Sequence, residues 1–548
     1  MMKHWQSFKK TIILCGIILL IVPVNVQAIS QKSFLPKTPA TSTPGEIIEV
    51  TCSEPYPTIS QPVHLLITLQ GKAKTRFIET LTVHDEFSGF TLTNGEMIWT
   101  SGSLMEHQLN LTIGLLPHYT KKLLWYPSIV GNHTLRISTT SGEKFLNVSV
   151  GFDVEGIITP SLGRPVIINK NHTNQFCLSV SEERAETEEP SQIAKVMLHS
   201  IDGTSSYELE DQTEKWSTWI PTGTDIVEDD LIVSYDIDSI PIGFYNISVF
   251  TTTTEYTWPH AVQLIQDEPS EYSVVQLSDI HIGKYSNPVD KKKELIRLFT
   301  YINENIHPAF VILTGDSVDW YNTRPDRNPY EELREALLQC HSPVFTVPGN
   351  HERYANSLLF LYFPYTNLTP YHFYLNPVSD YSMQYGGINY VFLDSGFEYS
   401  RWELPQIWSL TPEGSGLTNT QMYLLENLWG KPQMHQMIVM HHPVVSDTND
   451  TGLGALPNTL PSGNNECIAH NRGELITYCR EKNVSLVLTG HTHKNHVFTS
   501  LGTEATNSTA WPLFIQTDAA TLNRENNGGR IMLIQQGEII GYDYHPFN

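Results

Sequence analysis

Near residue 265 the pattern of apolar residues changes, and this change divides the chain into two parts. Before it, apolar and polar side chains alternate in short runs, as in 63–69 and 146–152. Alternation with a period of two residues, bounded by Gly, Pro, Ser and Asn, is typical of half-buried antiparallel strands. After residue 270, short apolar runs alternate with segments of helical spacing. That order is typical of βαβ units and a largely parallel sheet.

The N-terminal part is predicted to form two β-sandwiches. Two strand-like segments, which begin at Gly131 and Gly243, resemble the last strands of separate modules. Their separation fits the ~100-residue length of an immunoglobulin-like domain. We therefore expect immunoglobulin-like sandwiches at 40–154 and 155–265. Neither has a cluster of His, Cys or paired carboxylates, so we interpret them as spacers or as modules that bind a surface or a protein partner.

The C-terminal part has the signals of alternating strands and helices. Helices are predicted at 290–306 and 330–340, and a third at 418–428, where Thr418 and Gln421 have the spacing of a capping box. Strands are predicted at 274–277, 310–313, 344–347, 436–440, 485–488 and 513–516. Two final strand-like segments, at 530–534 and 539–544, suggest antiparallel closure of a sheet.

Five polar motifs follow the predicted strands. In chain order they are Asp279-Ile280-His281, Gly315-Asp316, Gly349-Asn350-His351-Glu352, Met440-His441-His442-Pro443 and Gly490-His491-Thr492-His493. In an open α/β sheet, ligands bind just beyond the carboxyl ends of the strands. One such motif arises easily by chance, but five in order at strand ends indicate a single site.

The residue types in these motifs favour two metal ions. Asp, Asn and His offer oxygen and nitrogen donors that suit first-row divalent metals such as Mn, Fe, Co or Zn. A carboxylate shared by two ions ~3.5–4 Å apart would clamp a phosphoryl group and acidify a bridging water, and the resulting hydroxide could attack phosphorus in line. In an extended His491-x-His493 both imidazoles lie on one face, so that each could serve one ion.

Together the motifs resemble the signature of the calcineurin-like metallophosphoesterases, over 271–548. The resemblance implies an α/β/β/α sandwich of two facing sheets with a dinuclear site at one edge. It implies that the first ion is held by Asp279, His281, Asp316 and His493, and the second by Asp316 as a bridge, Asn350, His441 and His491.

Three further residues near these motifs have expected roles. His351 resembles the family's histidine that contacts phosphate and protonates the leaving group, as general acid catalysis requires. Asp319 resembles an acid that orients this histidine, although a plain loop carboxylate is an alternative. Between the adjacent His441 and His442, the family's His-x-Pro spacing favours His441 as the ligand. His442 would then either support the ligands without binding the metal or be exposed.

The charge of the chain restricts its partners. There are 34 Lys and Arg against 58 Asp and Glu, a net charge of −24. So acidic a surface repels a nucleic-acid polymer, and we expect small phosphorylated molecules as substrates. The expected activity is that of a phosphatase or phosphodiesterase. The alternative is a surface-binding protein whose phosphoesterase scaffold is catalytically idle.

The N-terminus is typical of an export signal. Lys3, Lys9 and Lys10 precede an uncharged run at 11–24, and small residues around Ala28 offer a cleavage point. We expect a signal peptide at 1–28 and a secreted or extracytoplasmic protein, with an uncleaved anchor as the alternative. No other segment is long and apolar enough to span a membrane. Five cysteines follow the signal, and the candidate disulfides are Cys52–Cys177 and Cys467–Cys479.

Overall fold

The computed structural model describes residues 43–547, apart from 56, 62, 73–74, 115–116, 174, 182–192, 212–232, 284–289, 320–327, 354–367, 397–415, 446–466, 469, 506–510 and 522–526. The predicted signal peptide at 1–28 lies outside the described residues. Within them, no helix is long and apolar enough to cross a membrane.

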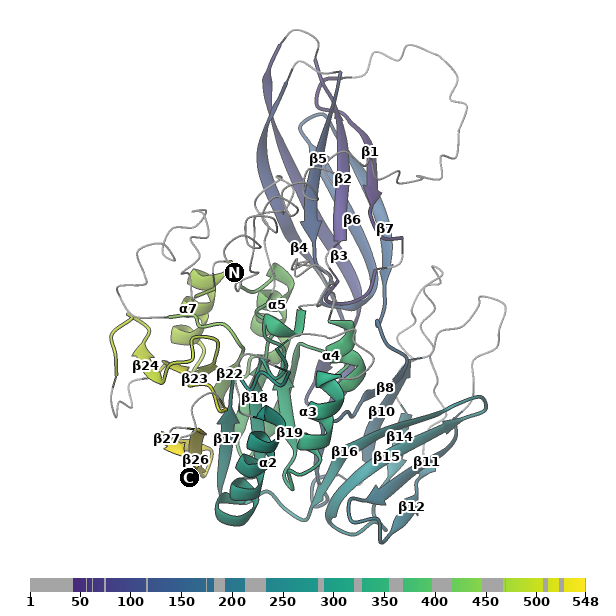
Figure 1. The fold of residues 1–548 in the computed structure, drawn as a ribbon. Coiled ribbons are helices and arrows are strands. Elements are labelled where there is room, and N and C mark those ends of the chain that lie inside the picture. The colour runs from purple at the N-terminus through teal and green to yellow at the C-terminus, as the bar shows by residue number, and fades with distance from the viewer. Residues whose placement is uncertain are drawn as a thin grey trace, which may run out of the picture. The chain divides into compact units, whose positions relative to one another are not determined.

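The first N-terminal region consists of strands, as predicted (Figure 1). They are β1 (Ile47–Cys52), β2 (Val63–Gln70), β3 (Phe77–Thr93), β4 (Glu96–Ile113), β5 (His118–Trp125), β6 (Val130–Thr139) and β7 (Gly142–Val150). Strands β1, β2 and β5 form one sheet, and β3, β6 and β7 belong to another. In β2, alternate residues from Val63 to Leu69 are buried, which confirms the predicted period of two.

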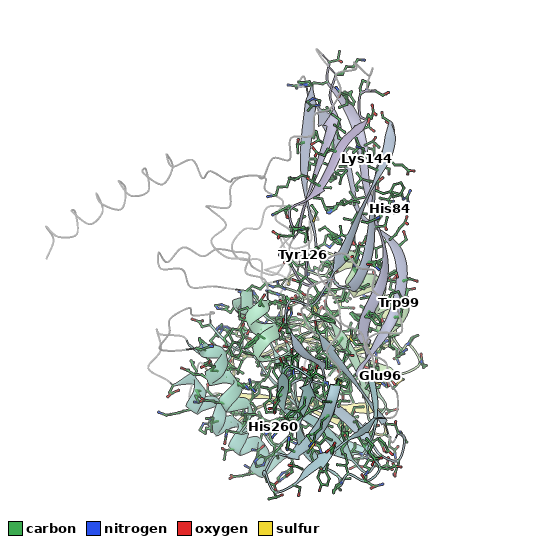
Figure 2. All side chains as sticks on the ribbon, turned by 90° about the vertical axis from the view of Figure 1, so that its right-hand side faces the viewer. His84, Glu96, Trp99, Tyr126, Lys144 and His260 are labelled. Carbon is green, nitrogen blue, oxygen red and sulfur yellow. The ribbon has the colours of Figure 1, made fainter. Side chains whose placement is uncertain are left out.

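Strands β3 and β4 form a long hairpin because of the two residues that connect them. Asn94 and Gly95 both have positive φ, at 51° and 81°. A two-residue turn with positive φ at both positions matches the right-handed twist of the flanking strands. Register is kept from Thr93 opposite Glu96 to Phe77 opposite Ile113, with one irregularity. Figure 2 labels His84 on β3 and Trp99 and Glu96 on β4, one after another along this hairpin.

The tip of this hairpin joins the C-terminal sheet, which the sequence did not predict. Strand β20 (Tyr381–Tyr385) pairs in parallel with β3, with Tyr381 opposite Leu92. The indole Nε1 of Trp429 also donates a hydrogen bond to the carbonyl oxygen of Leu92 over 3.1 Å. The result is a ten-stranded sheet that includes strands from both parts of the chain. An immunoglobulin-like class for this region, and a boundary near 155, stay predictions.

The second N-terminal region forms two sheets, with strand orders β13-β14-β10-β8 and β12-β11-β15-β16-β9. Their strands are β8 (Gly156–Thr159), β9 (Val166–Asn169), β10 (Gln175–Ser181), β11 (Ile193–Ser200), β12 (Ser206–Glu208), β13 (Glu210–Asp211), β14 (Val233–Asp236), β15 (Gly243–Thr251) and β16 (Glu255–Ile265). Leu178, Leu198 and Ile247 are buried together in one core.

The C-terminal region contains two sheets built largely from parallel strands. One has the order β19-β18-β17-β26-β27; the other includes β24-β25-β23-β22-β21-β20. The strands are β17 (Glu271–Leu277), β18 (Phe310–Thr314), β19 (Val344–Val347), β21 (Ile388–Phe392), β22 (His435–Val439), β23 (Val484–Thr489), β24 (His496–Thr499), β25 (Leu513–Gln516), β26 (Gly528–Gln535) and β27 (Glu538–Pro546). Antiparallel pairing of β26 with β17 and β27 gives the closure that the sequence suggested.

Helices pack on the outer face of each sheet, while the inner faces share a core. Val274 points into a core that also contains Phe392 and Val439 of the other sheet, whereas its neighbour Val275 packs with Leu295 of α2. This alternation follows from the pleat of a strand. On the other sheet, α5 and α7 supply a third core. The helical segments are α2 (Lys291–Tyr301), η2 (Ile302–Ile306), α3 (Pro329–Leu337), η3 (His351–Arg353), α4 (Thr369–Tyr374), α5 (Asn419–Leu424), η4 (Leu425–Trp429) and α7 (Arg472–Glu481).

Two local expectations have clear outcomes. The capping box is confirmed, since Thr418 Oγ1 accepts from Gln421 N–H and the Gln421 side chain accepts from Thr418 N–H. Neither candidate disulfide is formed in the part of the chain that the structure describes. Cys52 and Cys177 lie in different sheets, and Cys479 is buried in the apolar core around α7.

Candidate metal centre

The seven predicted ligands all lie in loops that directly follow strands. The first sheet supplies Asp279 and His281 after β17, Asp316 after β18 and Asn350 after β19; the second supplies His441 after β22, and His491 and His493 after β23. Because the carboxyl ends of parallel strands meet at the same edge of a sheet, the two sheets bring these side chains to one place.

Several of these loops have strained backbones. Five of the predicted ligands have a left-handed backbone with φ between 51° and 69°: Asp279, His281, Asp316, His491 and His493. Such conformations cost of order 1 kcal/mol or more each in residues other than glycine, and they tend to gather at functional sites. Adjacent glycines permit close packing. A Cβ at Gly349 would lie 2.2 Å from Asp316 Oδ1, and one at Gly490 would lie 2.5 Å from Asp279 Oδ2.

Asp279, His281 and His493 form one cluster of donor atoms. His493 Nε2 lies 3.2 Å from Asp279 Oδ1 and 3.1 Å from His281 Nε2. Asp316 Oδ2 lies 3.9 Å from His281 Nε2. Asp279, His281 and His493 can hold a metal ion together, since one donor atom from each lies within 4.8 Å of the others. These residues are the four expected at the first ion.

A second cluster is centred on His441. Its Nε2 lies 3.3 Å from Asp316 Oδ2 and 3.1 Å from Asn350 Oδ1. Asp279, Asp316 and His441 form another group that can hold a metal ion, so Asp279 belongs to both groups. The ring of His491 lies 5.1 Å from that of His441, and its backbone N–H donates to Asp279 Oδ2 over 2.9 Å.

The adjacent His441 and His442 have different hydrogen-bond partners, although both belong, with His491, to a further group that can hold a metal ion. His441 Nδ1 lies 2.7 Å from the carbonyl oxygen of Thr314. An Nδ1–H bonded in this way leaves Nε2 as the donor atom that faces Asp316. His442 is also fully buried, so the expectation that it could be exposed is wrong. Its Nδ1 lies 3.1 Å from Ser395 Oγ, and its ring packs 4.6 Å from that of His491.

His351 and Asp319 lie beside the first cluster. His351 Nδ1 lies 2.7 Å from the backbone oxygen of Asp319 and 3.5 Å from its carboxylate oxygen Oδ1, and Nε2 lies 3.8 Å from Asp316 Oδ2. The His351 side chain is 21% exposed, whereas those of Asp316 and Asp319 are buried. A partly exposed imidazole next to buried donors is placed to reach a bound substrate.

The sequence reasoning assigned no role to Glu352, although it ends one of the motifs. Its buried carboxylate accepts hydrogen bonds from backbone N–H groups in the Asp316 and Asn350 loops. Burial, reinforced by the charge of Asp316, raises its pKa to about 7. The available signal in the sequence was its position: Glu352 is a charged residue directly after Asn350 and His351, which both have expected roles.

The electrostatics of the site fit a metal centre. Burial lowers the pKa of His281 to about 4 and that of His491, which the charge of His441 lowers further, to about 3. Burial would raise the pKa of Asp279, but His493 outweighs it and brings that pKa to about 2. His281 and His491 are therefore neutral imidazoles and Asp279 is an ionised carboxylate, the forms that bind metals. His441 differs, because the charge of Asp316 raises its pKa to about 9.

One buried donor atom also fits a metal centre. His442 Nε2 has no hydrogen-bond partner within the described residues. Buried polar atoms normally have a hydrogen-bond partner, and a bound ion is one of the usual reasons for an exception.

The family comparison agrees with the motifs. The family model of the calcineurin-like phosphoesterases matches residues 272–495. No curated protein matches the chain significantly.

Solved structures show only weak similarity. The chain is similar to a β-glucosidase from Listeria innocua in complex with gluconolactone, at 14% identity and a TM-score of 0.16, covering 20% of this chain and 16% of that one. It is also similar to red sea bream transglutaminase, at 8% identity and a TM-score of 0.14, covering 39% of this chain and 31% of that one. The chain thus spans less than a third of either protein. At such TM-scores the similarity supports no conclusion on fold or function.

Proposed function

We propose that the protein is a metal-dependent phosphoric ester hydrolase, because residues 272–495 match the family model of the calcineurin-like phosphoesterases. The observation that carries the proposal is the convergence of Asp279, Asp316 and His441, with their neighbours, into overlapping groups that can each hold a metal ion. Asp279, His281, Asp316 and His493 would hold one ion, and Asp316, Asn350, His441 and His491 the other. Bound there, two first-row ions would neutralise phosphoryl oxygens and acidify a water.

The protein's own groups would orient and protonate the substrate. His351 lies at the partly exposed side of the site, and its Nδ1 is bonded to the Asp319 backbone oxygen over 2.7 Å. With a hydrogen on Nδ1, Nε2 would contact a phosphoryl oxygen and, when protonated, give its proton to the leaving oxygen. Asp319 keeps the ring in this orientation from a buried position.

We propose small phosphorylated molecules as substrates, either monoesters or diesters. The net charge of −24 disfavours a nucleic-acid polymer. The donor set suits either ester, because a pair of ions can clamp the attacking and leaving oxygens of both. Export is a further proposal, supported by the basic start and the uncharged run at 11–24. Mass spectrometry of the N-terminal peptide, on protein purified from the cells that naturally produce it, would test whether 1–28 is removed.

The experiment that tests the proposed function combines metal analysis with hydrolysis assays. Purified protein should bind two ions per chain and hydrolyse p-nitrophenyl phosphate, bis-p-nitrophenyl phosphate or both when Mn²⁺ is added. The ratio of the two rates separates a monoesterase from a diesterase. No bound metal and no turnover with Mn²⁺ would contradict the proposal and favour a binding protein with an idle scaffold.

A further inference from the structure

Glu352 connects the two loops that carry Asp316 and Asn350. It lies in the single 3-10 turn η3, directly after Asn350, and is only 1% exposed. Its two carboxylate oxygens accept hydrogen bonds from four backbone N–H groups. Oε2 accepts from Asp316 over 3.0 Å and from Gly349 over 2.6 Å, and Oε1 accepts from Ser317 over 2.7 Å and from Val318 over 3.2 Å.

Among the described residues, no backbone carbonyl accepts from these four N–H groups. Three follow strand β18 and one follows β19. A buried N–H group without an acceptor costs free energy comparable to a lost hydrogen bond. The carboxylate therefore satisfies both loops at once, and a change in their separation would break bonds to at least one oxygen.

The distance between these loops also sets the geometry of the metal donors. Asp316 Oδ1 accepts from the backbone N–H of His351 over 2.9 Å. Asn350 Oδ1 lies 3.1 Å and Asp316 Oδ2 lies 3.3 Å from His441 Nε2. Asp316 has a φ of 51°, a conformation that its surroundings must impose. Its own N–H is one of the four that Glu352 binds.

On the basis of the proposed function, we propose that Glu352 is a positioning residue that holds the Asp316 loop against the Asn350 loop and so sets the spacing of the donors around the two ions. It belongs to none of the groups of described residues that can hold a metal ion. A glutamine would not replace it, because its amide NH₂ would face two N–H groups in place of an acceptor oxygen.

The test compares Glu352→Gln with Glu331→Gln, a matched control on the exposed side of α3. Metal-free full-length protein is titrated with Mn²⁺ and the affinity of each variant is measured. Changes to groups that orient metal ligands typically weaken binding 10–100-fold, and we expect a loss in that range for Glu352→Gln and none for Glu331→Gln. Electron paramagnetic resonance should also show altered coupling between the two Mn²⁺ ions in Glu352→Gln alone.

A second measurement does not depend on the variant folding. In metal-free wild-type protein, hydrogen exchange at the backbone N–H groups of residues 316–318 and 349 should be strongly protected. Free exchange there, or Mn²⁺ affinity and coupling in Glu352→Gln equal to those of the wild type, would overturn the role of Glu352. Wild-type protein that binds no Mn²⁺ would instead contradict the proposed function, so the two failures are distinguishable.

Discussion

Oδ1 of Asp319 lies 3.2 Å from Nδ1 of His281, and the same carboxylate oxygen lies 3.5 Å from Nδ1 of His351. One buried carboxylate thus faces both an expected metal ligand and the expected general acid. A histidine whose Nδ1–H faces a carboxylate keeps Nε2 for the metal and becomes a stronger donor. Asp319 therefore has a second contact beyond the orientation of His351 that the family resemblance implied.

Asp319→Asn should weaken metal binding as well as catalysis. Loss of the carboxylate behind His281 is expected to lower Mn²⁺ affinity about 10–100-fold, as measured by calorimetric titration. Asp238→Asn, at an exposed position of the second N-terminal region, is the control. If Asp319→Asn binds Mn²⁺ as tightly as the control, Asp319 acts on His351 only.

His351→Ala should separate catalysis from metal binding. Removal of a general acid typically lowers turnover about 10²–10⁴-fold, and we expect a loss of that order with p-nitrophenyl phosphate. Metal content by mass spectrometry should stay at two ions per chain, because His351 is not an expected ligand. Loss of both metals in this variant would show that its assigned role is wrong; His118→Ala on β5, also exposed, should change neither quantity.

Metal binding should strengthen as the pH rises. Burial would lower the pKa of His441, but the charge of Asp316 outweighs burial and raises that pKa to about 9 in the metal-free protein. A metal must therefore displace a proton from His441 Nε2. Below about pH 9, the Mn²⁺ dissociation constant should therefore fall as the pH increases. Calorimetric titrations in buffers of different ionisation enthalpy should show that protons are released when the metal binds. A pH-independent dissociation constant would contradict this assignment.

A buried ion pair in the first N-terminal region should make stability depend on pH. His133 Nδ1 lies 2.9 Å from Asp85 Oδ2, and Nε2 lies 3.0 Å from the carbonyl oxygen of Ile129. Burial would lower the pKa of His133, but the charge of Asp85 outweighs it and the pKa is raised. The protonated pair thus contributes its full stability below the unfolded pKa of ~6.5, and this contribution is lost as the pH rises through the folded value.

His133→Gln should remove this dependence and leave Asp85 without its charged partner. Breaking a buried pair from one side typically costs about 3–5 kcal/mol. Urea denaturation of wild type and variant on both sides of neutral pH measures both effects. The difference in unfolding free energy between wild type and variant should be smaller at alkaline pH than at acid pH. A difference that does not become smaller would contradict the charged state of His133.

The convergence of the site could be predicted from the sequence, because the nearby residues alone show that each motif follows the end of a strand. Asp279, Asp316 and His441 each directly follow an apolar run, and the ends of such runs meet in space. The contacts between loops were not predictable in this way. Asp319 contacts His281, and Glu352 accepts from the N–H group of Asp316. These contacts depend on loop backbones, including residues with positive φ, which the spacing of the motifs does not reveal.

The junction of the two parts of the chain was also beyond sequence reasoning. Leu92 lies opposite Tyr381 in the ten-stranded sheet. Pairing at a strand edge uses backbone groups that every residue other than proline has, so it leaves little signal in the side chains. The change in the pattern of apolar residues near residue 265 marks a change in the type of structure. One sheet nevertheless includes strands from both sides of this position.

The most direct test of a two-metal site is anomalous diffraction from crystals grown with Mn²⁺. Two anomalous peaks ~3.5–4 Å apart are expected, with Asp316 between them, one beside Asp279, His281 and His493 and the other beside Asn350, His441 and His491. A single peak, or none within reach of Asp316, would contradict the dinuclear centre on which the proposed hydrolysis depends.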